Sequence, residues 1–124
     1  MTEKLKRILI VDDDEGFLAF ARDAALTKGW AVETAANGIE GCDAFIRFRP
    51  DIVLLDIVMP KMDGFEVLHW LAEQHTDCRI IVLTGYNPSY AAMAEQLGGA
   101  NGLMQVTMMT KPVRLAALVA AMAE

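Results

Sequence analysis

The sequence predicts an α/β fold in which a parallel, five-stranded sheet lies between two layers of helices. Short apolar runs rich in β-branched residues are typical of strands that are buried on both faces of a parallel sheet. Such runs occupy Ile8–Val11, Ile52–Leu55 and Ile80–Leu83. Amphipathic helical patterns alternate with these runs along the whole chain, as expected for βα units with right-handed crossovers.

Residues that start or stop a helix bound most of the predicted elements. Glycine and proline end helices, and asparagine or aspartate caps a first turn. The first half is predicted to hold a strand at 8–11, a helix at 15–28 that stops at Gly29, a strand at 30–35, a helix at 39–48 after Asn37-Gly38 and before Pro50, and a strand at 52–56. The second half is predicted to hold a helix through 65–71 after the loop at 59–64, a strand at 80–84, a helix at 90–97 that ends at Gly98-Gly99, a strand between 103 and 110, and a helix at 113–123.

The second strand differs from the others at its carboxyl end. It runs into Thr34-Ala35-Ala36, which offers no reactive side chain. A strand without chemistry at this end is a candidate for the sheet edge, and this favours the flavodoxin-like strand order 2-1-3-4-5.

Composition limits the possible functions of the chain. With 124 residues, 54% hydrophobic and 23% charged, one domain with its own core is expected. A net charge of −6 argues against nucleic-acid binding, which depends on a basic surface. No stretch is apolar and long enough to suggest a membrane span, and the N-terminus does not resemble a signal peptide. Cys42 and Cys78 have no metal-binding spacing, so free thiols in the cytoplasm are expected.

Reactive side chains follow four of the predicted strands directly. Asp12 and Asp13 follow the first, Asp56 ends the third, Thr84 ends the fourth, and Lys111 follows the fifth. Since ligands of open parallel sheets bind beyond the carboxyl ends of the strands, these side chains are predicted to meet in one pocket.

The predicted pocket is suited to a divalent cation and a phosphoryl group. Crowded carboxylates repel one another unless a cation or a lysine balances them. Oxygen ligands favour Mg²⁺ or Mn²⁺ over zinc. A metal, a lysine and a hydroxyl together can stabilise a transferring phosphoryl group, and a carboxylate beside them can accept it.

Four motifs, in the order in which they occur along the chain, resemble those of the receiver domains of two-component response regulators, of the kind found in chemotaxis signalling. The resemblance covers the whole chain. Each motif alone is weak, but four in order at strand ends are specific. The motifs are Ile8–Asp13, Leu55–Pro60 with Met62–Gly64, Val82–Gly85, and Lys111-Pro112.

The resemblance implies a role for each residue of the pocket. Asp56 would be the phosphoacceptor, and Asp13, Asp56 and the backbone carbonyl of Val58 would bind Mg²⁺ or Mn²⁺ directly. Asp12 would bind the cation through a water molecule. Thr84 and Lys111 would contact the phosphoryl group. The small Gly85 would leave the path to Asp56 open.

The resemblance also implies a phosphorylation-dependent signalling switch with no further enzyme activity. A sensor histidine kinase or phosphotransfer protein would donate the phosphoryl group, and the face of the fourth helix, fifth strand and fifth helix would contact an unknown downstream protein. That face is also a candidate for a phosphorylation-dependent homodimer. Residues 1–124 are expected to form one receiver domain without an output domain.

Two alternative functions remain open at this point. A Mg²⁺-dependent phosphatase with an aspartate nucleophile needs an acid two residues after that nucleophile, where this chain has Val58. A pseudo-receiver would interact with partners without being phosphorylated, because Lys111 would be out of register. For a true receiver, the absence of an acid at Val58 and Tyr86 predicts slow self-dephosphorylation.

Other polar residues have simpler interpretations. Asp14 and Glu15 are expected at the N-terminus of the first helix. Asp63 is expected to be a turn residue before the third helix or the N-cap of that helix. His69 and His75 are expected at the surface.

The chain departs from the family pattern just before Lys111. Deleting Gln105–Met109 restores the usual length, which suggests about five extra residues. The aromatic residue that receivers place on the fifth strand is replaced by Met108 or Leu103, depending on the direction of counting. The extra residues could alter the output switch or shift Lys111, and the favoured interpretation is a surface loop.

Overall fold

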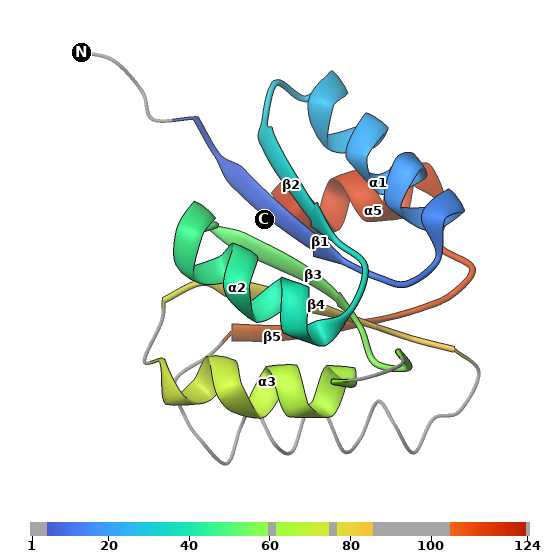
Figure 1. Ribbon diagram of the computed structural model, residues 1–124. Helices are drawn as coiled ribbons and strands as arrows, with labels where there is room; N and C mark the ends of the chain where they lie inside the picture. The colour runs from blue at the N-terminus through green and yellow to red at the C-terminus, as the bar shows by residue number, and fades with distance from the viewer. Residues whose placement is uncertain (1–4, 60–61, 75–76, 86–104, 124) are drawn as a thin grey trace.

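Five parallel strands form one sheet in the order β2-β1-β3-β4-β5, which confirms the predicted fold class and strand order (Figure 1). This computed structural model describes residues 5–59, 62–74, 77–85 and 105–123. The predicted helix at 90–97 lies outside the described residues. The strands are β1 (Arg7–Val11), β2 (Ala31–Ala35), β3 (Ile52–Asp56), β4 (Arg79–Thr84) and β5 (Gln105–Thr110). The helices are α1 (Glu15–Thr27), α2 (Gly38–Phe48), α3 (Gly64–Glu73) and α5 (Leu115–Ala123).

Helix ends follow the caps that the sequence suggested. Asp14 accepts hydrogen bonds from the first amides of α1, and Asn37 accepts one from the backbone N–H of Glu40 in α2. Asp63 forms a capping box with Glu66 at the start of α3, which confirms its predicted role. Gly29, with φ of +80°, follows the end of α1.

Helices cover both faces of the sheet, α1 and α5 on one side and α2 and α3 on the other (Figure 1). Leu9 and Val11 of β1 point into the core beneath α2 and α3, whereas Ile8 and Ile10 point into the core beneath α1 and α5. All five residues of β3 are buried. This burial explains why the central strands are almost continuously apolar rather than alternating.

The expectation of a surface loop over Gln105–Met109 is wrong, because these residues belong to β5. They pair with β4 from Arg79↔Gln105 to Leu83↔Met109. Val106 and Met108 pack against the core beneath α2 and α3, and Met109 packs against the opposite core. β-branched residues are common in strands, and flexible methionines can fill an irregular core. Comparison with the usual family length therefore wrongly suggested a loop where the residue types are compatible with an edge strand.

None of the helices within the described ranges is long and apolar enough to cross a membrane.

We predict that Gly64→Ala destabilises the protein, because the first residue of α3 leaves no room for a side chain. A Cβ atom there would overlap the carbonyl oxygen of Asp56 and the Cα atom of Ile57. Gly64 also donates a 2.8 Å backbone hydrogen bond to Ile57. Overpacking against backbone should lower the free energy of unfolding by roughly 2–3 kcal/mol, measured by urea denaturation.

Gly85→Ala is the matched control for stability. A Cβ atom at this position meets no atom of the described residues within 4 Å, so the free energy of unfolding should change by less than about 0.5 kcal/mol. Equal stability of the two variants would contradict the close approach of α3 to the end of β3.

Candidate functional site

Three carboxylates meet at the carboxyl end of the sheet, as the sequence predicted. Asp12 and Asp13 follow β1, and Asp56 is the last residue of β3. One oxygen of each lies within 4.8 Å of the others. Asp12 is fully buried and Asp56 is 6% exposed, whereas Asp13 is exposed. β1 and β3 are direct neighbours in the sheet, which brings these residues together despite their separation in sequence.

Lys111 reaches this cluster from the opposite edge of the sheet. It follows Thr110, whose backbone pairs with that of Thr84 at the end of β4. The Lys111 Nζ atom lies 2.7 Å from Asp12 Oδ2 and 3.9 Å from Asp56 Oδ1. The unusual sequence before Lys111 therefore does not move this residue away from the acids.

Both oxygens of the buried Asp12 carboxylate have partners. The backbone N–H of Asp14 donates to Oδ1 at 2.9 Å, and Lys111 donates to Oδ2. A buried carboxylate needs such partners, since an unpaired charge in the interior is costly. The position of Asp12 is thus determined by its own loop and by β5 together.

Phe17 is a neighbour of the lysine that the sequence did not reveal. The Lys111 Nζ atom lies 4.6 Å from the centre of the Phe17 ring. In the sequence, Phe17 is only part of the apolar stripe of α1. The contact joins the first turns of α1 to the residue that follows β5, and no local pattern of the sequence indicates it.

The environment of Asp56 raises its pKa from 3.8 to about 7. Burial is the main cause, and the negative charges of Asp12 and Asp13 act in the same direction. The positive charge of Lys111 and a backbone hydrogen bond from Val58 oppose this rise in the pKa. Asp56 therefore lies where additional positive charge would favour its ionised form.

The donor set fits a hard divalent cation. Three carboxylate oxygens within 4.8 Å of one another can contribute to the coordination of Mg²⁺ or Mn²⁺ and leave room for other oxygen ligands. Val58, the further predicted ligand, lies two residues after Asp56, and its side chain is 58% exposed.

The other predicted site residues are described in part. The backbone of Thr84 ends β4, but its side chain lies outside the described part of the structure. Gly85 lines a cavity of about 490 Å³ together with Phe17 and Lys111. A Cβ atom on Gly85 would meet no atom of the described residues within 4 Å. Tyr86 and His75 lie outside the described residues, and His69 is exposed on α3.

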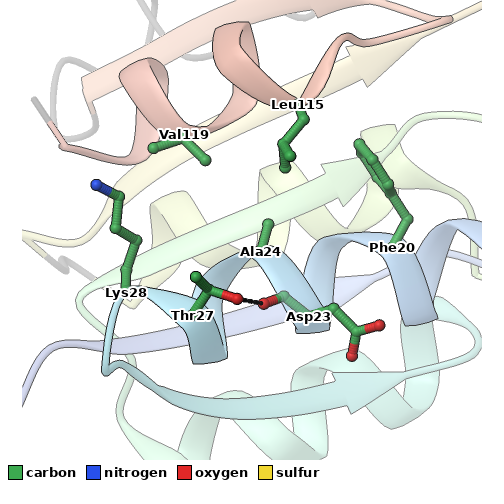
Figure 2. A pocket seen from close by; sticks show the side chains of 7 residues that line it. All are labelled: Phe20, Asp23, Ala24, Thr27, Lys28, Leu115 and Val119. Atoms are coloured by element: carbon green, nitrogen blue, oxygen red, sulfur yellow. Dashed lines mark hydrogen bonds between the residues drawn. The ribbon is translucent and has the colours of Figure 1, made fainter.

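A second cavity, of about 240 Å³, lies between α1 and α5 (Figure 2). Its lining is mainly apolar, and the Thr27 hydroxyl donates to the backbone carbonyl of Asp23. The lining residues are Phe20, Asp23, Ala24, Thr27, Lys28, Leu115 and Val119. This groove offers no cluster of reactive groups, so the acidic edge of the sheet is the better candidate for chemistry.

Comparison with known proteins gives a consistent result. A family model of the response regulator receiver domain matches residues 8–123. Response regulator MprA of Mycobacterium sp. (strain KMS) is 36% identical over 116 residues, which cover 94% of this chain and 48% of that protein. MprA of Mycobacterium avium (strain 104) is 35% identical, with 49% of its length covered. The chain thus spans about half the length of the curated relatives it matches.

Solved structures agree with the sequence comparison. A response regulator receiver domain protein (CheY-like) from Methanospirillum hungatei JF-1 superposes with a TM-score of 0.84 and 29% identity, over 97% of this chain and 92% of that one. Chemotaxis protein CheY4 of Vibrio cholerae superposes with a TM-score of 0.82 and 26% identity, over 97% and 98% of the two chains.

We predict that the raised pKa of Asp56 makes the metal-free protein less stable as pH rises. The unfolded side chain loses its proton near pH 4, but the pKa in the folded protein is about 7. Between these values the unfolded chain binds fewer protons, so increasing pH favours unfolding. Asp56→Asn should therefore exceed the wild type in stability at pH 8 by roughly 1–3 kcal/mol, a difference that shrinks towards pH 4.

Urea denaturation in the presence of a chelator, repeated from pH 4 to pH 8, measures this difference. Asp43→Asn removes an exposed aspartate of α2 and is the control. A difference between Asp56→Asn and wild type that does not change with pH would contradict the assignment.

Proposed function

The chain belongs to the response regulator receiver domain family, and from this membership we propose that it is a phosphorylation-dependent switch with Asp56 as its phosphoacceptor. Receiver domains of this family are signalling modules of two-component systems. The observation that supports the proposal best is the position of Asp56, which lies among two further carboxylates and 3.9 Å from the Lys111 ammonium.

Phosphoryl transfer would form one bond and break another. An Asp56 carboxylate oxygen would attack the phosphorus of a phosphohistidine, forming an aspartyl phosphate as the phosphorus–nitrogen bond breaks. The histidine nitrogen would leave with the bonding electron pair. Lys111, only 3.9 Å from Asp56, would pair with the phosphoryl oxygens, and Thr84 would donate a hydrogen bond to one of them.

Asp12, Asp13, Asp56 and the backbone carbonyl of Val58 would hold Mg²⁺ or Mn²⁺. Asp12 would act through a water molecule. Bound metal would supply positive charge that neutralises the phosphoryl oxygens. It would also favour the ionised, nucleophilic form of Asp56, whose pKa is raised to about 7 in its absence.

The output surface would include β5 and α5, together with the helix predicted at 90–97. Met108 pairs with Val82 of β4 and packs against the core beneath α2 and α3. It lies three residues before Lys111, where receivers usually carry an aromatic side chain. A flexible methionine there would transmit phosphorylation by repacking rather than by rotation of a ring.

The partners that this proposal requires are a sensor histidine kinase or phosphotransfer protein and a downstream protein. A second copy of the chain could use the same output surface in a phosphorylation-dependent homodimer. The net charge of −6 gives no support to nucleic-acid binding.

Two observations favour this proposal over its alternatives. Lys111 lies close to both Asp12 and Asp56, as a receiver that is phosphorylated requires. The pseudo-receiver hypothesis instead expects Lys111 to be displaced from these acids. An aspartate-based phosphatase would need an acid at Val58, whose side chain is apolar and exposed.

We expect acetyl phosphate with Mg²⁺ to add one phosphoryl group to Asp56, measured by intact-protein mass spectrometry and peptide mapping. Asp56→Asn should abolish the adduct, and Asp43→Asn should leave it unchanged. Lys111→Met should reduce the rate of its formation at least about tenfold, because the lysine charge no longer stabilises the phosphoryl group. A folded wild-type protein that forms no adduct would refute the switch. Turnover of external phosphoesters would instead indicate a phosphatase.

We expect the phosphorylated protein to lose its phosphoryl group slowly. Val58 lies two residues after the acceptor, and its exposed, apolar side chain offers no group that could orient an attacking water molecule. Val58→Asn should accelerate dephosphorylation on the order of tenfold, which is less than a fully positioned general base provides. The decay of the aspartyl phosphate after removal of acetyl phosphate measures both rates. Faster decay in the wild type than in Val58→Asn would contradict this role.

A further inference from the structure

Among the described residues, the Lys111 ammonium contacts two carboxylates and one uncharged ring. Asp12 lies 2.7 Å away, Asp56 lies 3.9 Å away, and the centre of the Phe17 ring lies 4.6 Å away. The ring distance is shorter than those of the two other cation–π contacts in the described residues. These place Lys6 5.3 Å from the Trp30 ring and Arg7 5.4 Å from the Phe48 ring.

A short hydrogen-bonded segment holds two of these neighbours in place. The backbone N–H of Asp14 donates to Asp12, and the Asp14 side chain accepts from the backbone N–H groups of Gly16 and Phe17. Asp12 and Phe17 are therefore linked through one helix cap. The Phe20 ring also lies beside Phe17, with 5.9 Å between the two ring centres.

We propose that Phe17 is a positioning residue, whose ring holds the Lys111 ammonium in place between Asp12 and Asp56. This inference rests on the proposed function, in which Lys111 must pair with a phosphoryl group on Asp56. The Lys111 side chain is 26% exposed, so without a partner beside the acids it could extend towards solvent. An aromatic face attracts an ammonium. The Phe17 ring is held by a helix, α1, rather than by a loop.

The Phe17 ring adds to the attraction that Asp12 exerts on the Lys111 ammonium, because Asp12 also has a second proposed role. In the proposed function this carboxylate also contributes to cation binding, which divides its attraction for Lys111. Phe17 offers no oxygen to a hard cation, so its attraction for the ammonium remains. The two neighbours together would keep Lys111 beside Asp56 whether or not Asp12 is engaged elsewhere.

The simpler interpretation is that Phe17 only packs against the core beneath α1 and α5, to which it is adjacent. A double-mutant cycle separates the two roles. If Phe17 acts through Lys111, Phe17→Leu should slow adduct formation from acetyl phosphate with Mg²⁺ roughly three- to tenfold in the wild-type background. In the Lys111→Met background the same change should alter the rate by less than about twofold.

Matched variants test the aromatic face itself. Phe17→Tyr keeps a ring and should retain the wild-type rate. Phe48→Leu removes the ring beside Arg7 at the opposite end of β1, and its effect should be the same with and without Lys111. Thermal unfolding measurements should show that every variant is folded at the assay temperature, so that differences in rate do not arise from differences in folding.

A spectroscopic readout is independent of phosphorylation. In the metal-free protein, NMR resonances of the Lys111 ε-methylene group should be shifted upfield by the ring current in the wild type and in Phe17→Tyr. The shift should disappear in Phe17→Leu. Absence of the shift in the wild type would overturn the contact and the inference.

The remaining outcomes are distinguishable. An equal loss of rate from Phe17→Leu in both backgrounds, or no loss in either, would overturn the positioning role while leaving the proposed function intact. A wild-type protein with the upfield shift but no adduct on Asp56 would instead refute the proposed function, and with it the role of Phe17.

Discussion

The balance of charge between buried carboxylates and one lysine is the constraint on which the site depends. Asp12 and Asp56 are buried side by side at the ends of neighbouring strands, and Asp13 adds a third charge. Lys111 compensates for part of this charge through its 2.7 Å contact with Asp12. Burial, together with the remaining negative charge of Asp12 and Asp13, raises the pKa of Asp56 to about 7. Such a site favours the binding of a cation, which supports the proposed role of Asp56 as a cation-dependent phosphoacceptor.

The architecture around the site explains how such crowding is tolerated. The strands beneath it are buried on both faces, so their carboxyl ends are held by two cores rather than by the loops alone. Gly64 lets α3 approach the backbone just after Asp56, and the Asp14 cap connects Asp12 to the start of α1. Rigid supports of this kind keep like charges together, because relaxation of the loops would otherwise separate them.

Prediction from sequence succeeded where local chemistry and periodicity agree. The apolar runs predicted the strands, and Asp14 and Asp63 predicted helix starts, because these signals act within a few residues. At Gln105–Met109 the prediction of a strand between 103 and 110 is confirmed, but the surface loop that comparison with the usual family length suggested for the same residues is wrong. The contact between Phe17 and Lys111 left no local signal, because the two residues are 94 positions apart in the sequence.

The sequence by itself determined the fold class, the strand order and the residues that gather at the carboxyl edge of the sheet. Parallel strands place their carboxyl ends on one side, so reactive residues after each strand must converge. Only the tertiary structure decided that Lys111 is within reach of both acids, that the pKa of Asp56 is raised, and that an aromatic ring lies beside the ammonium. These features depend on distances across the sheet and on burial, which arise from packing between segments rather than from any one of them.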